Sequence, residues 1–233
     1  MEYIILITIS ILIIIVLTLV IEIKIKNIKE IGENKKLNEI VKKFPNNIDV
    51  CKEILKKLGN DTTKVKETID KNAKSSLYII ATDSIIIANI KDSFTRIQTI
   101  AHECIHSIQN KKIVWFNFVF TNIFLIYYIT TIVLTIMGIY TNYLLQISIL
   151  LLLSSVQFMI RSFIENEAMI KAKYVAKEYM ESNNLEKQEI IDEIINEYDK
   201  LNDLGIKLVN LKLFVSNLFK IIIYMAIALI KTV

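Results

Sequence analysis

Long uncharged stretches alternate with charged stretches along this chain, and they predict membrane-spanning helices. Residues 3–21 and 113–160 contain no charged side chain. A single span takes about 20 apolar residues, so the first stretch predicts one helix and the second a helical hairpin that turns near residues 138–143. Residues 213–230 are similarly apolar except for Lys220, whose long side chain can reach a membrane interface. We therefore expect a mainly α membrane protein with three or four transmembrane helices.

The polar stretches between these spans predict a small α+β part. The sequence NNIDVCKEILKKLGN predicts an amphipathic helix capped by Asp49 and ended by Gly59, and residues 63–74 predict another short helix. SLYIIA and SIIIANI flank TDS and are rich in β-branched residues, which predicts a β-hairpin. SIIIANI would offer an edge for an extended substrate if it is an edge strand, and otherwise it is an ordinary half-buried strand. Residues 92–112 predict one helix, with Ser93 as its cap.

The same alternation divides the chain into five parts. The turn near residues 138–143 has no Lys or Arg, whereas the other ends of the predicted spans have many, so the positive-inside rule places the charged parts in the cytosol. The N-terminal stretch lacks the basic start and cleavage site of a signal peptide, which favours a retained anchor in the cell membrane. The expected parts are an anchor (1–23), a cytosolic α+β part (24–112), a transmembrane hairpin (113–160), a cytosolic helical part (161–206) and a C-terminal hydrophobic helix (207–233).

Composition narrows the classes of function. The chain is 53% hydrophobic and carries 28 Lys and Arg against 24 Asp and Glu, a net charge of +4. Because the charges are mixed in sign, they give no nucleic-acid surface, and the expected partner beside a substrate is the lipid bilayer. Two cysteines do not make a disulfide framework. The spans carry no ionisable side chain except Lys220, which argues against a transporter.

Both histidines of the chain lie in AHECIHSIQ, four residues apart, with a glutamate after the first. On a helix, His102 and His106 point the same way, so both imidazoles can bind one Zn²⁺ at about 2.0–2.1 Å. Glu103 lies on the adjacent face, where it can deprotonate a water held at the metal. The alternative interpretation is two polar side chains that share a helical face by chance.

A third protein ligand is needed to complete a catalytic zinc site, and no histidine remains. Lys112 stands where H-E-x-x-H-x-x-G-x-x-H would have its third histidine, which excludes that class. A two-span hairpin returns the chain to the side it left, and the first carboxylates after the return are Glu165 and Glu167. Both stay open as ligands, since acids in the first turn of a helix also suit its dipole.

At this point the sequence resembles a known family. AHECIHSIQ is similar to the A-H-E-x-G-H-A-x-Q signature of the YugP-type neutral zinc metallopeptidases of bacteria, and the order of hydrophobic and polar segments is also similar. FIENEA resembles the P-V-E-F-D-A-S-like segment that follows the hairpin in that family. A looser similarity is to membrane gluzincins of the HtpX type, whose third ligand is the first Glu of E-x-x-A-D. Both resemblances imply a zincin-like fold and Glu165 as the third ligand.

The resemblance implies a zinc-dependent peptidase that cleaves peptides or membrane proteins at the cytosolic membrane surface, with Glu103 as base. Ile105 replaces the signature glycine and Met169 replaces a small or acidic residue, so a catalytically silent zinc-binding scaffold is the main alternative. An intramembrane protease is disfavoured because Arg96 and Lys111 bracket the motif. A helical membrane protein with no metal is the remaining alternative. The sequence offers Arg161, Tyr174 or a backbone N–H as the oxyanion donor without choosing among them. Gln109 is either a group behind the ligands or an ordinary polar helix residue.

Overall fold

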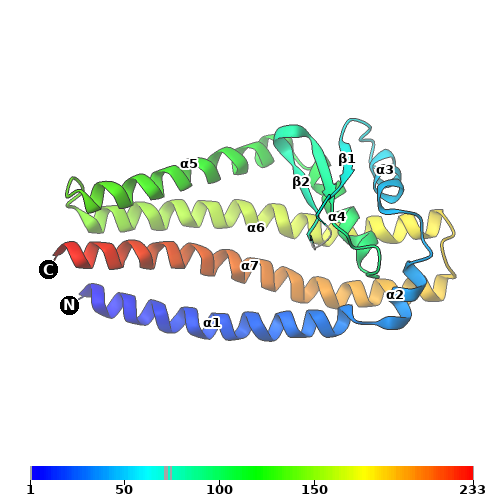
Figure 1. The fold of residues 1–233 in the computed structure, drawn as a ribbon, viewed down its shortest axis with the longest axis horizontal. Coiled ribbons are helices and arrows are strands. Elements are labelled where there is room, and N and C mark those ends of the chain that lie inside the picture. Colours follow the sequence, from blue (N-terminus) through cyan, green and yellow to red (C-terminus); the bar gives the residue numbers. More distant parts are fainter. Residues whose placement is uncertain (1, 71–72, 74, 233) are drawn as a thin grey trace. The chain divides into compact units, whose positions relative to one another are not determined.

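The computed structural model describes residues 2–70, 73 and 75–232, and within them the chain is mainly helical with one small sheet (Figure 1). Parts of the segments predicted at 1–23, 63–74 and 207–233 lie outside the described residues. The elements are α1 (Glu2–Gly32), α2 (Lys35–Val41), α3 (Asn47–Lys57), β1 (Lys64–Glu67), β2 (Leu77–Ile79), the 3-10 helix η1 (Ile80–Thr82), β3 (Ser84–Ile87), α4 (Arg96–Ile108), α5 (Lys111–Ile136), α6 (Tyr143–Ser182) and α7 (Gln188–Thr232).

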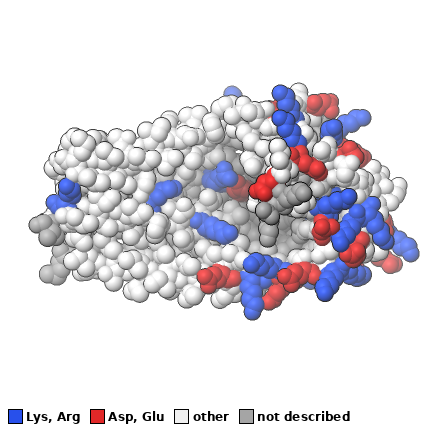
Figure 2. Space-filling model, viewed as in Figure 1, with Lys and Arg blue, Asp and Glu red and all other residues white. Residues whose placement is uncertain are grey.

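The chain forms two compact units. The first comprises Met1–Ile25, Trp115–Phe163 and Lys207–Val233, and the second comprises Lys26–Val114 and Ile164–Ile206. On the face shown in Figure 2, charged side chains are sparse on the first unit and crowded on the second. We call them the apolar unit and the polar unit.

Among the described residues, four helices are long and apolar enough to cross a membrane, which indicates a membrane protein. They are α1, α5, α6 and α7, with the α1 candidate taken from Ile4 to Gly32. The most apolar window of α1 buries none of its residues inside the protein, as expected of a helix that faces lipid. The expectation of three or four transmembrane helices is thus confirmed at the level of length and composition.

Inside the apolar unit, hydrophobic packing is joined by a few polar pairs. Phe124, Leu150 and Tyr224 belong to its buried cluster. The α7 lysine, Lys220, donates to Asn217 Oδ1 at 3.1 Å, and its Nζ lies 5.2 Å from the Phe124 ring centroid. These contacts stabilise the one charged side chain of residues 213–230, so Lys220 does not interrupt α7.

The sheet of the polar unit has the strand order β1-β3-β2. β2 and β3 are antiparallel, with Tyr78 opposite Ile85, which confirms the predicted hairpin. β1 pairs in parallel with β3, with Val65 opposite Ile85. The short helix predicted at residues 63–74 is therefore wrong where β1 lies, because pairing with a distant strand overrides the helix propensity of its lysines and glutamate.

β3 is the central strand of this sheet, and its Ile85 and Ile87 are fully buried. It therefore cannot offer a free edge to a substrate, and the edge-strand interpretation of SIIIANI is wrong. Of the two hairpin strands, β2 is the one at the edge of the sheet.

Helix ends in the polar unit differ from the predictions by a few residues. α3 is capped by Asn46, whose Oδ1 accepts from the Asp49 N–H, so Asp49 is not the cap. Gly59, at φ +70°, follows the end of that helix as predicted. α4 begins at Arg96 without a side-chain cap, and Ser93 lies in the turn before it. Asn46 has the better position because it precedes the first helical residue.

A buried arginine ties the start of α4 to α2 and α3. The Arg96 guanidinium donates to Asn47 Oδ1 at 2.8 Å and to the carbonyl oxygens of Val41 and Phe44 at 2.9 Å. Its side chain is fully buried, so neutral oxygens rather than a carboxylate satisfy most of its donors. Arg96 thereby fixes the first turn of α4.

α6 and α7 approach closely inside the polar unit. A Cβ added at Gly205 would lie 2.6 Å from the Met169 Cε, and Asn202 Nδ2 donates to the Met169 carbonyl oxygen at 3.1 Å. The glycine therefore makes room for the methionine side chain.

Candidate metal centre

One face of α4 packs into the polar unit's core, and this orients the opposite face. Ile97, Ile100, Ala101 and Cys104 are fully buried, and the Cys104 Sγ lies 3.6 Å from the Cys51 Sγ of α3. Packing of this apolar stripe leaves the two histidines on the other side of the helix.

His102 and His106 meet through their Nε2 atoms, which lie 3.0 Å apart. Their rings are perpendicular, with centroids 4.6 Å apart. The i, i+4 spacing gives this approach directly, because the two side chains stand one above the other on one helical face. The sequence motif therefore has the predicted local geometry.

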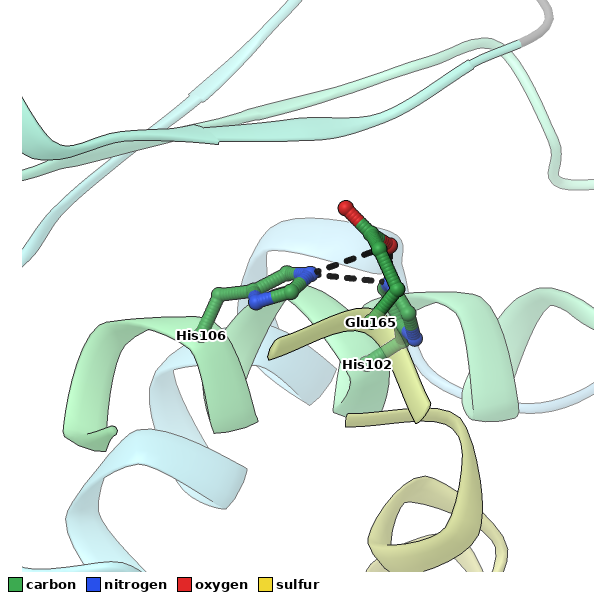
Figure 3. A group of neighbouring side chains, drawn as sticks. All are labelled: His102, His106 and Glu165. Carbon is green, nitrogen blue, oxygen red and sulfur yellow. Dashed lines mark hydrogen bonds and ion pairs between the residues drawn. The ribbon is translucent and has the colours of Figure 1, made fainter. Parts of the chain in front are cut away.

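Glu165 of α6 completes the cluster. Its Oε2 lies 3.5 Å from the His102 Nε2 and 3.7 Å from the His106 Nε2, and the three side chains converge on one point in Figure 3. They are 20%, 12% and 13% exposed for His102, His106 and Glu165. One ligand atom from each lies within 4.8 Å of the others, so this group could hold a metal ion.

The distances fit a tetrahedral ion. Ligand atoms bound at about 2.0–2.1 Å to one tetrahedral zinc stand roughly 3.4 Å from each other. The three separations between Nε2, Nε2 and Oε2 are 3.0, 3.5 and 3.7 Å, so small side-chain movements would bring all three to bonding distance. Two imidazoles and one carboxylate also form a donor set that zinc binds in enzymes.

Glu103 lies beside this group and is 6% exposed. Burial raises the pKa of its carboxyl group, and the nearby His102 and His106 oppose that shift without cancelling it. The Tyr78 backbone N–H of β2 favours the charged carboxylate and also opposes the rise. Glu103 is thus a buried carboxyl group with a proton affinity above that of an ordinary glutamate.

The pKa of His106 is also shifted by the cluster. Burial acts to lower it, but the Glu165 carboxylate, 3.7 Å from the His106 Nε2, and the charge of Glu103 raise it overall. A cation therefore suits the site electrostatically, whether it is a proton on His106 or a metal ion.

Gln109 follows the last residue of α4, and its side chain contacts both His106 and α6. Its Oε1 lies 2.8 Å from the His106 Nδ1, while its Nε2 donates to the Ile164 carbonyl oxygen at 2.8 Å and to Glu167 Oε2 at 2.9 Å. Lys171 donates to the other oxygen of Glu167 at 2.5 Å. The two glutamates considered from the sequence therefore have different partners.

Tyr78 joins the site to a second group of polar side chains. Its hydroxyl donates to Asp83 Oδ1 at 2.8 Å and accepts from Lys111 Nζ at 2.7 Å. Asp83 has φ 43° and also accepts from the hydroxyl of Thr63. Burial acts to raise the Asp83 pKa, but hydrogen bonds from Tyr78, Thr63 and Lys111 outweigh it and lower the pKa. These hydrogen bonds connect β2 to the residue before β3 and to the first residue of α5.

The two side chains that the sequence offered as oxyanion donors lie in different parts of the structure. Tyr174 is 61% exposed and stands roughly 13 Å further along α6 than Glu165, too far to meet the same carbonyl oxygen. Arg161 belongs to the apolar unit. The Tyr78 backbone N–H was missed because no side-chain pattern marks a backbone donor, and its position depends on how the hairpin packs on α4.

Comparison of the chain with protein-family models, curated proteins and solved structures finds no match.

Proposed function

We propose that the chain is a membrane-bound zinc metallopeptidase that hydrolyses peptide bonds at the cytosolic membrane surface. The observation that carries the proposal is the convergence of the His102 Nε2, the His106 Nε2 and Glu165 Oε2, with the buried Glu103 next to them. The similarity of AHECIHSIQ and FIENEA to YugP-type peptidases supports the same function and a zincin-like fold. Peptides or membrane proteins are the proposed substrates.

In this proposal His102, His106 and Glu165 hold Zn²⁺. The ion, when bound, acidifies a water molecule and polarises the scissile carbonyl group. Glu103 takes a proton from the attacking water and passes it to the leaving amine as the carbon–nitrogen bond breaks. Its raised pKa suits both steps, because the group must accept a proton and then release it.

The Tyr78 backbone N–H keeps the Glu103 carboxylate in one orientation during this exchange. A base that is held in place loses less entropy on reaching the transition state than a mobile one. The partly exposed His102 and Glu165 leave the ligand cluster open to solvent, so a substrate can approach them.

A catalytically silent zinc-binding scaffold is the second candidate. The observation that favours it is Ile105, which stands at the signature glycine and is 2% exposed in the core. A scaffold would retain zinc and would not depend on Glu103.

The test compares the purified wild type with Glu103→Gln in proteoliposomes, using fluorescently labelled casein as substrate. The peptidase proposal expects hydrolysis by the wild type, its loss in Glu103→Gln, and equal zinc content in both, because the base is not a ligand. Glu178→Gln, an exposed glutamate of α6, is the matched control and should keep the activity.

Two results would reject the peptidase. Undiminished hydrolysis by Glu103→Gln would remove the proposed base. Stoichiometric zinc without hydrolysis of casein or of a peptide library by the wild type would favour the scaffold.

A further inference from the structure

Gln109 uses both ends of its amide in contacts that span two helices. The residue is 7% exposed, directly after α4. Its Nε2 lies 2.8 Å from the Ile164 carbonyl oxygen and 2.9 Å from Glu167 Oε2, and both partners belong to α6. The side chain therefore connects the helix that carries the histidines to the helix that carries Glu165.

These two contacts fix which way the amide points. A carbonyl oxygen and a carboxylate oxygen can only accept, so the atom between them has to be the NH₂ group. The reverse orientation would place the amide oxygen of Gln109 against two other oxygens. The Gln109 Oε1 must consequently face the His106 Nδ1, from which it lies 2.8 Å.

The orientation of the amide then decides the tautomer of His106. Because an amide oxygen can only accept, the His106 Nδ1 must carry the hydrogen, and a neutral ring then has its lone pair on Nε2. This Nε2 is the atom that lies 3.0 Å from the His102 Nε2 and 3.7 Å from Glu165 Oε2. The lone pair thus points to the place where the three donors converge.

Glu167 fixes Gln109 in turn. Lys171, one helical turn further along α6, donates to Glu167 Oε1 at 2.5 Å, which leaves Oε2 for Gln109. The contacts form one continuous series from Lys171 through Glu167 and Gln109 to His106. Once Lys171 occupies one oxygen of Glu167, the hydrogen bonds fix the orientation of the Gln109 amide and the tautomer of His106.

We propose that Gln109 is a positioning residue that holds His106 in its Nδ1–H tautomer, and that Glu167 positions Gln109 for this task. The inference rests on the metal site of the proposed function, but it does not depend on hydrolysis. A partner of this kind on the far nitrogen of a ligand histidine typically changes metal affinity 10–100-fold.

The test uses the full-length chain in detergent micelles and two measurements that need no activity. Zinc affinity is measured by competition with a chromophoric chelator. The tautomer is read from ¹⁵N NMR of the imidazoles in the zinc-free protein, at a pH where both rings are neutral. The chain has two histidines, so the spectra contain two rings, and His102→Gln assigns them.

Gln109→Leu keeps the approximate size and removes the acceptor. We expect it to lower zinc affinity at least tenfold and to remove the preference of His106 for Nδ1–H. Gln188→Leu, at an exposed glutamine outside the cluster, is the matched control and should change neither. Unchanged zinc affinity, or lowered affinity with Nδ1–H still dominant, would overturn the proposal.

An exchange of the two polar groups keeps the proposal testable if Gln109→Leu does not fold. Gln109→Glu alone brings two carboxylates together, and we expect it to lower zinc affinity at least tenfold. The double variant Gln109→Glu/Glu167→Gln keeps an acceptor at position 109 and places a donor at 167, so the two side chains can again form a hydrogen bond. Its affinity should return to within about threefold of the wild type. Equal affinities of the single and double variants would show that the two positions do not act together, contrary to the proposal.

Discussion

Glu165 and Glu167 lie two residues apart on α6, and their carboxylates have different partners: Glu165 approaches both histidines, whereas Glu167 binds Gln109 and Lys171. Neighbours two apart on a helix point roughly 200° from each other, so one metal ion cannot take both carboxylates in this helix. The hydrogen bonds of the Glu167 carboxylate lead to His106 through Gln109.

This difference predicts unequal effects of two matched substitutions. Glu165→Gln should lower zinc affinity at least tenfold, because a neutral amide replaces an anionic ligand. Glu167→Gln should keep most of the affinity, since its amide oxygen can still accept from Gln109. Chelator competition on both purified variants measures the difference. Loss of zinc from Glu167→Gln alone would show that the proposed third ligand is misassigned.

The histidine pair predicts a metal stoichiometry. The purified chain should hold about one zinc ion, and His102→Ala or His106→Ala should abolish binding, because each removes one of three ligands. Elemental analysis after removal of loosely bound metal gives the stoichiometry. Tyr174→Ala, at an exposed position on α6, should bind as the wild type does. Full zinc content in a double histidine variant would refute the site.

The membrane topology predicts a labelling pattern in intact cells. Single cysteines are introduced at Lys52, Thr141 or Glu178 after Cys51 and Cys104 are replaced by alanine. Lys52→Cys and Glu178→Cys should be protected from an impermeant maleimide, and Thr141→Cys should react, because the proposed site faces the cytosol. Opposite labelling at positions 52 and 178 would contradict a site built from residues on both segments.

We expect a substitution of Arg96, which is not one of the proposed ligands, to cause a large loss of stability. Arg96→Leu leaves the Asn47 Oδ1 and the carbonyl oxygens of Val41 and Phe44 without these donors, and should lower the free energy of unfolding by on the order of 3 kcal/mol. Denaturant unfolding in detergent measures it. Lys36→Gln breaks the exposed pair with Glu193 and should cost about 0–1 kcal/mol. Equal effects would show that Arg96 contributes no more than a surface pair.

Because of Asp83, we expect the folded protein to lose stability in acid. The pKa of Asp83 is lower in the folded protein than in the unfolded chain, so the carboxylate stabilises the fold above its ordinary pKa, near about pH 4. That contribution is lost as the pH falls through the lowered value. Asp83→Asn tolerates the same φ and should make unfolding less dependent on pH in this range. Asp61→Asn, at an exposed position, should keep the wild-type dependence.

The features that the sequence predicted best are those fixed by local spacing. The approach of His102 to His106 follows from the i, i+4 rule, and the β2–β3 hairpin follows from two β-branched segments close in sequence. β1 was missed because Lys64, Lys66 and Glu67 are good helix formers, and only pairing with β3 makes them a strand.

The contacts around the site were harder to predict, because they too depend on segments that are distant in the sequence. The motif placed Glu103 beside the histidines, but the influence of the Tyr78 N–H on its carboxylate depends on how a hairpin packs on α4. Gln109 was recognised only as a group behind the ligands, and its partners Ile164 and Glu167 come from a helix more than 50 positions later. Contacts of this range follow from tertiary packing, which local patterns do not contain.

The close approach of Gly205 to Met169 has a consequence for how this chain can vary. The two positions share one volume, since a Cβ on the glycine would meet the end of the methionine side chain. Alanine at 205 requires only that the flexible methionine shift, but a larger residue requires a smaller one at 169. Met169, the departure from the E-x-x-A-D pattern, is therefore half of a correlated pair. Its natural exchange for a small residue should be accompanied by a larger residue at position 205.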